Sequence, residues 1–200
     1  MSKTKTIDLT SGPILKTLAE LALPIMASSL LGTAYNITDM AWIGMLGSKA
    51  VAGVGVGGMY VWLSQGLVAL PRMGGQVNVA QACGRGDYEQ ARGYAASALR
   101  LTFLLGILFA AVCIVFIHPL LGFFNLGDAE TYTAAKLYTL ITCGLILFSF
   151  LNLTLTGLST AQGDSKTPLM ANLLGLVGNM ILDPILILGF GPFPRLEVVG

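Results

Sequence analysis

Five apolar runs, each long enough to cross a bilayer, constrain this chain more than any other feature of its sequence. A spanning helix needs about 20 mainly apolar residues, and the runs predict helices at 14–46, 50–82, 93–117, 131–159 and 168–190. Only 10% of the residues are charged, against roughly 25% in an ordinary soluble domain. The chain is therefore predicted to be an all-α integral membrane protein, with a transmembrane domain over residues 14–200 and a polar tail over residues 1–13.

Positive charge in the links between these runs predicts how the helices are oriented. The cations on one side are Lys3, Lys5, Lys16, Arg85, Arg92 and Lys166. On the other side, Lys49 and Arg195 are the main ones. Cytoplasmic loops carry the excess of Lys and Arg, so the tail is predicted to be cytoplasmic. The tail also lacks the apolar core of a signal peptide, and the expected location is the plasma (inner) membrane, with several passes.

Several function classes find no support in the sequence. A net charge of +1 without a basic run argues against a nucleic-acid partner, because such binding needs a concentrated cationic face. The cysteines Cys83, Cys113 and Cys143 have no partner at metal-ligand spacing and are expected to pack as small apolar side chains. No catalytic grouping is visible, and no organic cofactor is expected.

The glycine run "GVGVGG" resembles a nucleotide-binding motif only superficially. It lacks the preceding strand and the following acidic residue that give such a motif meaning. Gly53 and Gly57 are spaced as a small-xxx-small pair, which predicts close packing between helices.

The ionisable residues inside the predicted spans are the candidates for function. A charge within the membrane costs a few kcal/mol on insertion scales, so such a residue is functional by default unless it reaches an interface. The residues singled out are Glu20, Asp39, Arg72, Lys136 and Asp183. Glu20 and Arg72 lie towards the inner side, where they are expected to pair or to extend to water. Lys136 lies near an outer helix end and either reaches water or faces the carboxylates.

Asp39 and Asp183 form a matched pair by depth. At about 1.5 Å per residue, they lie ~14 Å and ~12 Å from the outer ends of their helices. Asn36 precedes Asp39 by three residues and Asn179 precedes Asp183 by four, so each carboxylate shares a helix face with an amide. Desolvation and a neighbouring carboxylate both favour the neutral form of a carboxyl group. The pair would therefore exchange protons, or hold Na⁺ among Asp39, Asn179 and Asp183; the alternative is that each aspartate only bonds a neighbouring helix.

Two prolines within these helices are candidate hinges. Pro24 lies fifteen residues before Asp39, and a missing amide with a clashing ring favours a kink there. A bend at Pro24 would move the half of the helix that carries Asp39, although a static kink is equally compatible with the sequence. Pro184 directly follows Asp183 and frees the carbonyl of Met180, which could join an ion site.

Three stretches carry a family resemblance: "LALPIMASSLLGTAYNITDMAWIG", "VAQACGRGDYEQAR" and "STAQGDSKTPLMANLLGLVGNMILDPILILG". They resemble the N-terminal lobe of a bacterial multidrug and toxic compound extrusion (MATE) transporter. The resemblance implies a twelve-helix fold of two six-helix lobes, opening alternately to either side and exporting small organic, often cationic or amphipathic, compounds in exchange for H⁺ or Na⁺. It implies that Asp39 is the acid of the first helix, near the proline matched by Pro24, and that Asn179 and Asp183 share the cation site.

The same resemblance implies a substrate cavity and a missing partner. Tyr138 matches an aromatic residue that lines the cavity, and Asn36, Lys136 and Asn152 are predicted to line it as well. Because the sequence stops before a sixth helix, the chain is expected to be a fragment that lacks the second lobe and does not transport alone. The alternatives are a lipid-linked or polysaccharide flippase of the same superfamily and, from another class, an intramembrane aspartyl protease.

Overall fold

The computed structural model describes residues 14–188, apart from the side chains of residues 16, 21, 184 and 186–188. All of the secondary structure in this part is helical. The helices are α1 (Ile14–Gly44), α2 (Ser48–Gly84), α3 (Tyr88–Val115), α4 (Ile117–Gly122), α5 (Ala129–Gly144), α6 (Ile146–Ala161) and α7 (Lys166–Leu188). The predicted tail at 1–13, Arg195 and the end of the chain lie outside the described residues.

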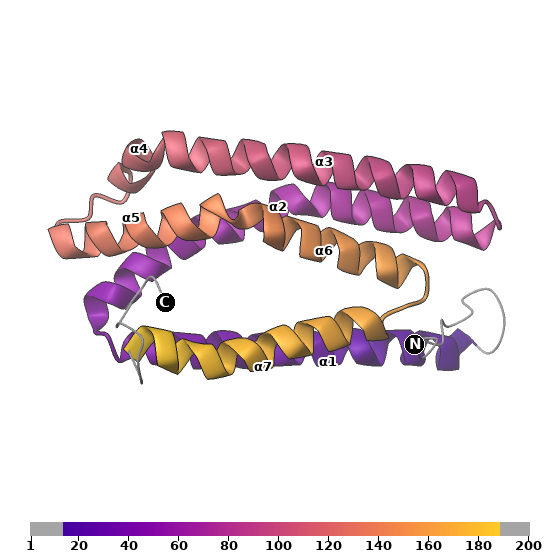
Figure 1. Cartoon of the computed structure of the whole chain (residues 1–200), viewed down its shortest axis with the longest axis horizontal. Helices are drawn as coiled ribbons and strands as arrows, with labels where there is room; N and C mark the ends of the chain where they lie inside the picture. The colour runs from indigo at the N-terminus through magenta and orange to yellow at the C-terminus, as the bar shows by residue number, and fades with distance from the viewer. Residues whose placement is uncertain (1–13, 189–200) are drawn as a thin grey trace.

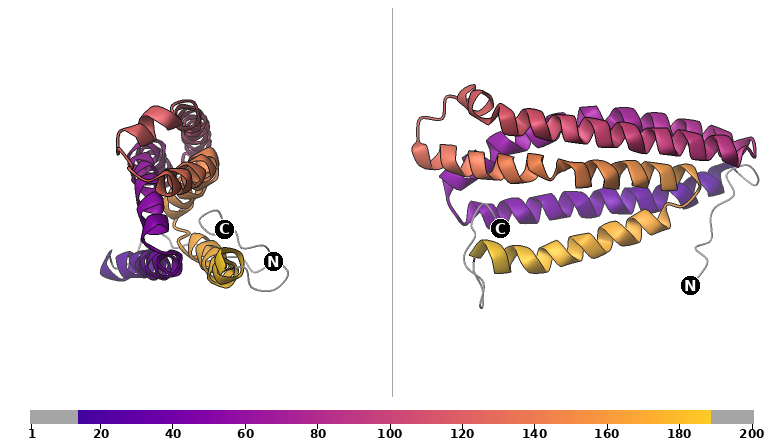
Figure 2. Two further views of the ribbon diagram at one scale, coloured as in Figure 1. Left: turned by 90° about the vertical axis from the view of Figure 1, so that its left-hand side faces the viewer. Right: turned by 45° about the horizontal axis from the view of Figure 1, so that its top comes forward.

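The helices form two groups that run roughly along one direction (Figures 1 and 2). In the first, α2 packs against α3, α5 and α6, and α3 also packs against α6. We call this group the bundle. In the second group α1 lies beside α7, and each makes fewer contacts with the bundle than with the other. Figure 1 shows this α1–α7 pair below the bundle, joined to it by the α1–α2 and α6–α7 turns.

Length and composition identify most of these helices as membrane spans. Thr17–Gly44, Ser48–Gly84 and Tyr88–Val115 are each long and apolar enough to cross a bilayer. The stretch Ala129–Gly144 with Ile146–Ala161 makes a fourth span if it is counted as one. The described part of α7 ends at Leu188, so the fifth predicted span stays a prediction.

The stretch predicted as one helix over 131–159 is divided in the structure. It bends by 45° between α5 and α6, where Gly144 ends one helix and Leu145 leaves helical geometry, with φ −96° and ψ 6°. Gly144 has little intrinsic preference for a helix, and the sequence has no proline here that would have indicated the break. The structure also differs from the prediction after α3. The chain turns at Phe116 and adds the short helix α4.

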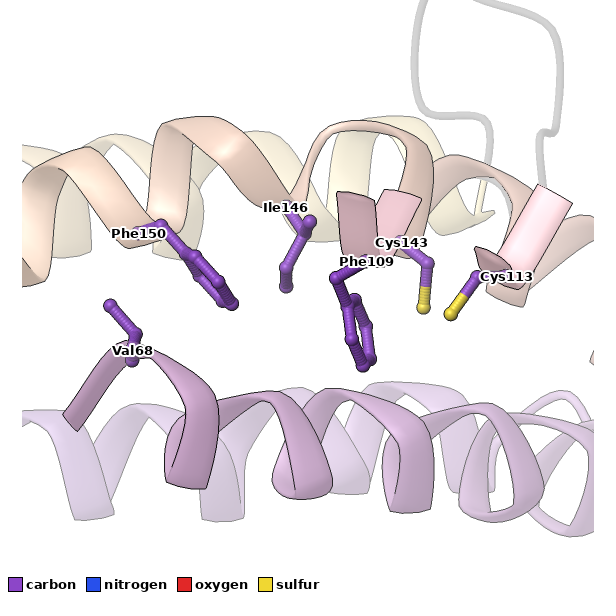
Figure 3. Packing of buried hydrophobic residues seen from close by; sticks show 6 residues of the cluster. All are labelled: Val68, Phe109, Cys113, Cys143, Ile146 and Phe150. Atoms are coloured by element: carbon purple, nitrogen blue, oxygen red, sulfur yellow. The ribbon is translucent and has the colours of Figure 1, made fainter. Parts of the chain in front are cut away.

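Apolar side chains from four helices fill the centre of the bundle. Figure 3 shows Val68 of α2, Phe109 and Cys113 of α3, and Ile146 and Phe150 of α6 converging with Cys143 of α5. The sulfurs of Cys113 and Cys143 point towards one another, and both cysteines are free and buried. The prediction that these two cysteines pack as small apolar side chains is confirmed.

The bundle helices approach closely at glycines. A Cβ at Gly53 would lie 2.9 Å from the Ala134 Cβ, and one at Gly57 would lie 2.5 Å from the Tyr138 ring. Real Cβ atoms essentially never come so close, so α5 can pack here only because α2 has no side chain at these positions. The predicted role of the Gly53–Gly57 pair in helix packing is therefore confirmed.

Ionic contacts join the bundle at the end opposite the Arg85 and Lys166 loops. The Lys49 ammonium, at the start of α2, lies 2.7 Å from a Glu130 carboxylate oxygen and 3.3 Å from one of Asp128. Asp128 caps α5 by accepting a hydrogen bond from the Thr131 amide. That bond, together with Lys49, holds the pKa of the Asp128 carboxyl below its ordinary value.

Candidate functional site

A polar cluster joins α1 to α7. The Asn179 side-chain amide of α7 donates a hydrogen bond to the Tyr35 hydroxyl of α1, over 3.2 Å. Asp39 lies one turn after Tyr35 and Asp183 one turn after Asn179, so both carboxylates share the faces that this bond connects. The charges of Asp39 and Asp183 act on one another and on Tyr35. We call Tyr35, Asp39, Asn179 and Asp183, with Tyr138, the coupling cluster.

Asp183 is the most enclosed member of the coupling cluster. Its exposed fraction is 9%, and its Oδ2 atom has no hydrogen-bond partner among the described residues. A buried carboxylate oxygen without a partner is costly while the group is charged. Protonation removes that charge, and a bound cation compensates it, so the position suits either ion.

Asp39 lies in a half-buried position on α1, with Trp42 one turn further along. The Trp42 indole nitrogen is also buried and has no partner within the described chain. Among the described residues no three His, Cys, Asp or Glu side chains gather as a metal site. The donors available to a cation are therefore two carboxylates and amide, hydroxyl or backbone oxygens, which are ligands suited to a hard ion.

Tyr138 of α5 brings the bundle to this cluster. Electrostatic interactions link its hydroxyl to Asp39 and Tyr35, while its ring lies against Gly57 of α2. The close approach at Gly57 thus packs the Tyr138 ring against α2, at a place where its hydroxyl is within electrostatic range of Asp39. Tyr138 is thus the one member of the coupling cluster that belongs to the bundle.

Other predicted cavity residues do not join the coupling cluster. Asn36 is exposed, and no interaction connects Lys136 with a carboxylate in the described part of the chain. Asn152 of α6 donates a long hydrogen bond of 3.4 Å to the Asn172 side chain of α7. Asn152 therefore links the bundle to α7 at another level of the helix.

The two candidate hinges lie inside helices. Pro24 falls within α1, which continues from Ile14 to Gly44 on both sides of it. The backbone of α7 likewise continues through residue 184 to Leu188. The proposal that these positions bend during a transport cycle stays a prediction.

The structure also forms a polar cavity that was not predicted from the sequence. Its volume is about 270 Å³, and it lies between α1, α2, α6 and the start of α7. Its lining consists of Ile25, Ser28, Ser29, Arg72, Gln76, Thr156, Gly157, Thr160, Ser165, Pro168 and Asn172. We call it the Arg72 cavity. Glu20 and Arg72 were expected either to pair or to extend to water. No ion pair joins them among the described residues, and Glu20 is exposed on α1, as the second alternative requires.

Three side chains were missed by reasoning from the sequence. Tyr35 lies four residues before Asp39, and this spacing alone places it on the same helix face. Asn172 and Ser165 carry no comparable local signal, since their neighbours come from other helices. Arg100 is a further cation within α3, but it is exposed and does not line the Arg72 cavity.

Long apolar helices with acidic side chains at the contact between two of them are typical of multi-pass membrane transporters. The chain belongs to the MATE family of transporters, since the MatE family model matches residues 24–185. Members of this family carry small organic compounds and are transporters rather than enzymes, which removes the protease alternative.

Similar proteins agree on this family. The chain is 29% identical over 192 residues to a FAD transporter of Shewanella oneidensis, covering 96% of this chain and 42% of that protein. It is 29% identical to a probable multidrug resistance protein NorM of Thermotoga maritima, covering 94% and 40%. A solved structure of a multidrug resistance MATE family transporter in an outward-facing conformation superposes with a TM-score of 0.83 at 26% identity, covering 100% of this chain and 44% of that one. The chain thus spans about two fifths of the length of these relatives.

Proposed function

We propose that this chain forms most of one lobe, the N-terminal one, of a cation-coupled exporter of small organic compounds. Asp39 and Asp183 are its coupling carboxylates, and Asn179 and Tyr35 orient them. The observation that carries the proposal is the coupling cluster itself, because it is the place where α1 and α7 meet through polar side chains. A charge placed there at a cost of a few kcal/mol needs a compensating use.

The cycle that follows from this arrangement is an exchange. With both carboxylates ionised, their repulsion and the unpartnered Asp183 oxygen favour uptake of a proton or of Na⁺. Uptake draws α1 and α7 together, and release separates them. Bending of α1 at Pro24 and of α7 at Pro184 would turn that change into movement of the helix halves that carry the acids.

The second lobe completes the transporter in this proposal. Alternating access is largely the rocking of one lobe against another around a fixed site, so the described helices supply one wall and the coupling ion site. Substrates are small organic compounds, cationic or amphipathic, held between the lobes. The ends that carry Arg85 and Lys166 face the cytoplasm, and the protein lies in the plasma (inner) membrane.

The proposal is tested by exchange in vesicles that contain the full-length protein. Asp39→Asn and Asp183→Asn should each abolish export driven by an imposed pH or Na⁺ gradient, while protein abundance and the unfolding temperature stay near wild type. Comparing the two gradients identifies the coupling ion.

Glu20→Gln is the matched control, because Glu20 is an exposed carboxylate on the same helix as Asp39. It should export at the wild-type rate. Gradient-driven export at an unchanged rate in both aspartate variants would show that these acids are not the coupling site.

Flipping of a lipid-linked or polysaccharide substrate is the second candidate function. It would require cations near the central cavity to hold phosphate groups. Of the two cations singled out within the predicted spans, Arg72 lines a cavity, whereas no interaction joins Lys136 to the coupling cluster among the described residues. Binding of a phospholipid-linked sugar to the purified protein, with no export of organic cations, would favour this function.

A further inference from the structure

The Arg72 cavity lies apart from the coupling cluster, and none of the five cluster residues lines it. It lies between α1, the second half of α2, the end of α6 and the start of α7, in the half of the molecule that carries Arg85 and Lys166. Arg72 is the one charged residue in its lining as described; every other polar lining residue is a Ser, Thr, Asn or Gln. The cavity is thus a cationic, donor-rich site without a carboxylate.

Arg72 supplies the positive charge in the lining of the cavity. A guanidinium group stays protonated in proteins, unlike the ammonium group of lysine. Arg72 is partly buried, and no carboxylate among the described residues forms an ion pair with it. An unpaired cation at this depth is destabilising unless an anion or water compensates it.

The fold holds the stem of Arg72 in place. A Cβ at Gly157 of α6 would lie 3.1 Å from the Arg72 Cγ and 3.4 Å from the Gln76 side-chain oxygen. The absence of a side chain at Gly157 therefore lets Arg72 and Gln76, one turn apart on α2, lie directly against α6. This contact presents their ends to the same cavity.

Ser165 provides a second and independent sign of a ligand. It lines the cavity at the start of α7, it is 3% exposed, and its hydroxyl has no hydrogen-bond partner among the described residues. A buried hydroxyl without a partner costs free energy unless a water or ligand satisfies it. Other hydroxyls of the lining are already used, since Ser29 and Thr160 donate to carbonyls of their own helices.

The backbone amides at the start of α7 are not available as donors to a ligand in this cavity. Asp164 accepts hydrogen bonds from the Lys166 and Thr167 amides, so these donors are occupied. Asp164 itself does not line the cavity. The donors that remain in the lining include the guanidinium group of Arg72, the amide of Gln76 and the hydroxyl of Ser165.

We propose that the Arg72 cavity binds a phosphate-type oxyanion, with Arg72 as its counter-charge and Gln76 and Ser165 as hydrogen-bond donors. Guanidinium groups match the geometry of phosphate oxygens and form charge-assisted hydrogen bonds with them. A volume of about 270 Å³ exceeds the roughly 30 Å³ of one water several times over, so the cavity accommodates a phosphate group. The phosphate comes from an anionic lipid headgroup or from a soluble phosphate compound.

Two binding experiments on the purified, delipidated full-length protein distinguish these sources. In one, the unfolding temperature is followed while phosphatidylglycerol is added, with phosphatidylcholine as the comparison. In the other, inorganic pyrophosphate is added, with chloride at equal ionic strength. Stabilisation by phosphatidylglycerol alone identifies a lipid headgroup, and stabilisation by pyrophosphate identifies a soluble ligand.

Variants then assign the binding to the cavity. Arg72→Gln should weaken binding of the active probe by at least about tenfold, because a charge-assisted bond is lost. Ser165→Ala should weaken it by about threefold, since one hydrogen bond is lost. Arg100→Gln is the matched control, because it removes an exposed cation of the same kind outside the cavity, and its binding should equal that of wild type.

Gln76→Glu tests the same site without removing Arg72. The added carboxylate would pair with the guanidinium group and should abolish binding even if Arg72→Gln does not fold. Equal binding in wild type, Arg72→Gln and Gln76→Glu would overturn the proposal, and so would the absence of a response to both probes. The proposal is separate from ion coupling, because Asp39→Asn should leave this binding unchanged.

Discussion

The bundle and the α1–α7 pair use different kinds of contact. The bundle buries phenylalanine, leucine and isoleucine side chains and brings helices together at glycines. Among the described residues of α1, only Ile43 is buried. Among those of α7, the buried residue is the carboxylate Asp183. The bundle is therefore stabilised by close packing, whereas α1 and α7 bury few side chains and are joined, among the described residues, by the hydrogen bond between Asn179 and Tyr35. A pair of helices with few buried apolar contacts separates at a lower free-energy cost.

The difference suits a transporter of this family. Packed interiors respond to strain as a unit and do not deform continuously, so the bundle is suited to be the fixed frame. Polar contacts such as the Tyr35–Asn179 hydrogen bond exchange readily when a nearby charge changes. Variants that affect one region and spare the other test this division.

Gly75→Ala should give the largest loss of stability. A Cβ at Gly75 would lie 2.6 Å from the Ala98 Cβ and 3.2 Å from a Leu158 methyl group. The first neighbour cannot rotate away, so α2 and α3 must separate, and overpacking of this kind costs about 1–3 kcal/mol. The measurement is the unfolding free energy in detergent.

Gly74→Ala is its matched control. Nothing lies within 4 Å of a Cβ placed there, and alanine favours a helix over glycine by about 0.5–1 kcal/mol. It should be as stable as wild type or more stable. Equal destabilisation by both variants would show that the bundle is not limited by packing at Gly75.

Thr154→Val should have a smaller effect within the bundle. The hydroxyls of Thr102 on α3 and Thr154 on α6 are 2.9 Å apart and buried, and one such hydrogen bond contributes about 1 kcal/mol. Valine keeps the shape and removes the bond. Unfolding of Thr154→Val, Thr102→Val and the double variant gives the coupling energy, and additive effects would contradict a direct contact.

Tyr35→Phe and Tyr60→Phe compare one hydroxyl in each region. Tyr35 accepts from Asn179 in the coupling cluster, whereas Tyr60 donates to the Leu120 carbonyl beside the bundle. Losing the Tyr35 bond should cost about 0.5 kcal/mol of stability but slow gradient-driven export. Tyr60→Phe should lower stability and leave export unchanged; the reverse outcome would contradict the division.

The α6–α7 turn, which joins the two regions, should show the smallest effect, as a pH dependence. Burial alone would raise the pKa of the Asp164 carboxyl, but hydrogen bonds from Thr167 and Lys166 outweigh it and hold the pKa below its ordinary value. A carboxyl whose pKa is lower in the folded state contributes stability above its unfolded pKa of about 4, and loses it as pH falls through the folded value.

Asp164→Asn measures this contribution. It retains a side-chain oxygen to accept hydrogen bonds and removes the titrating charge. Wild type should be more stable than Asp164→Asn at neutral pH, and their unfolding temperatures should converge below about pH 4. A difference that stays constant across this range would contradict the assignment.

Much of the fold follows from local patterns. The apolar runs predict the helical membrane protein, and the small-xxx-small spacing predicts close helix packing at Gly53 and Gly57; the structure identifies α5 as the partner. The bend at Gly144 and Leu145 could not be predicted, since glycines within spans such as Gly106 lie in continuous helix. Whether a glycine ends a helix depends on the packing of neighbouring helices.

The candidate site also contains residues that the sequence reveals and residues that only the structure reveals. Asp39, Asn179 and Asp183 are visible in the sequence because a charge or amide in an apolar run is costly wherever the helix packs. The partners of these residues are not visible in the sequence. Successive residues of a helix point about 100° apart, and the packing of α1 against α7 decides which of these faces meet.

The sequence by itself thus determined the class of protein, its apolar helical runs and the charged residues within them that are costly to bury. Only the tertiary structure decided that Tyr35 meets Asn179, that Glu20 does not meet Arg72, and that Arg72 and Ser165 share a cavity. The physical reason is that hydropathy acts through each segment's own composition, whereas hydrogen bonds and cavities depend on relative helix position, to within a few tenths of an ångström.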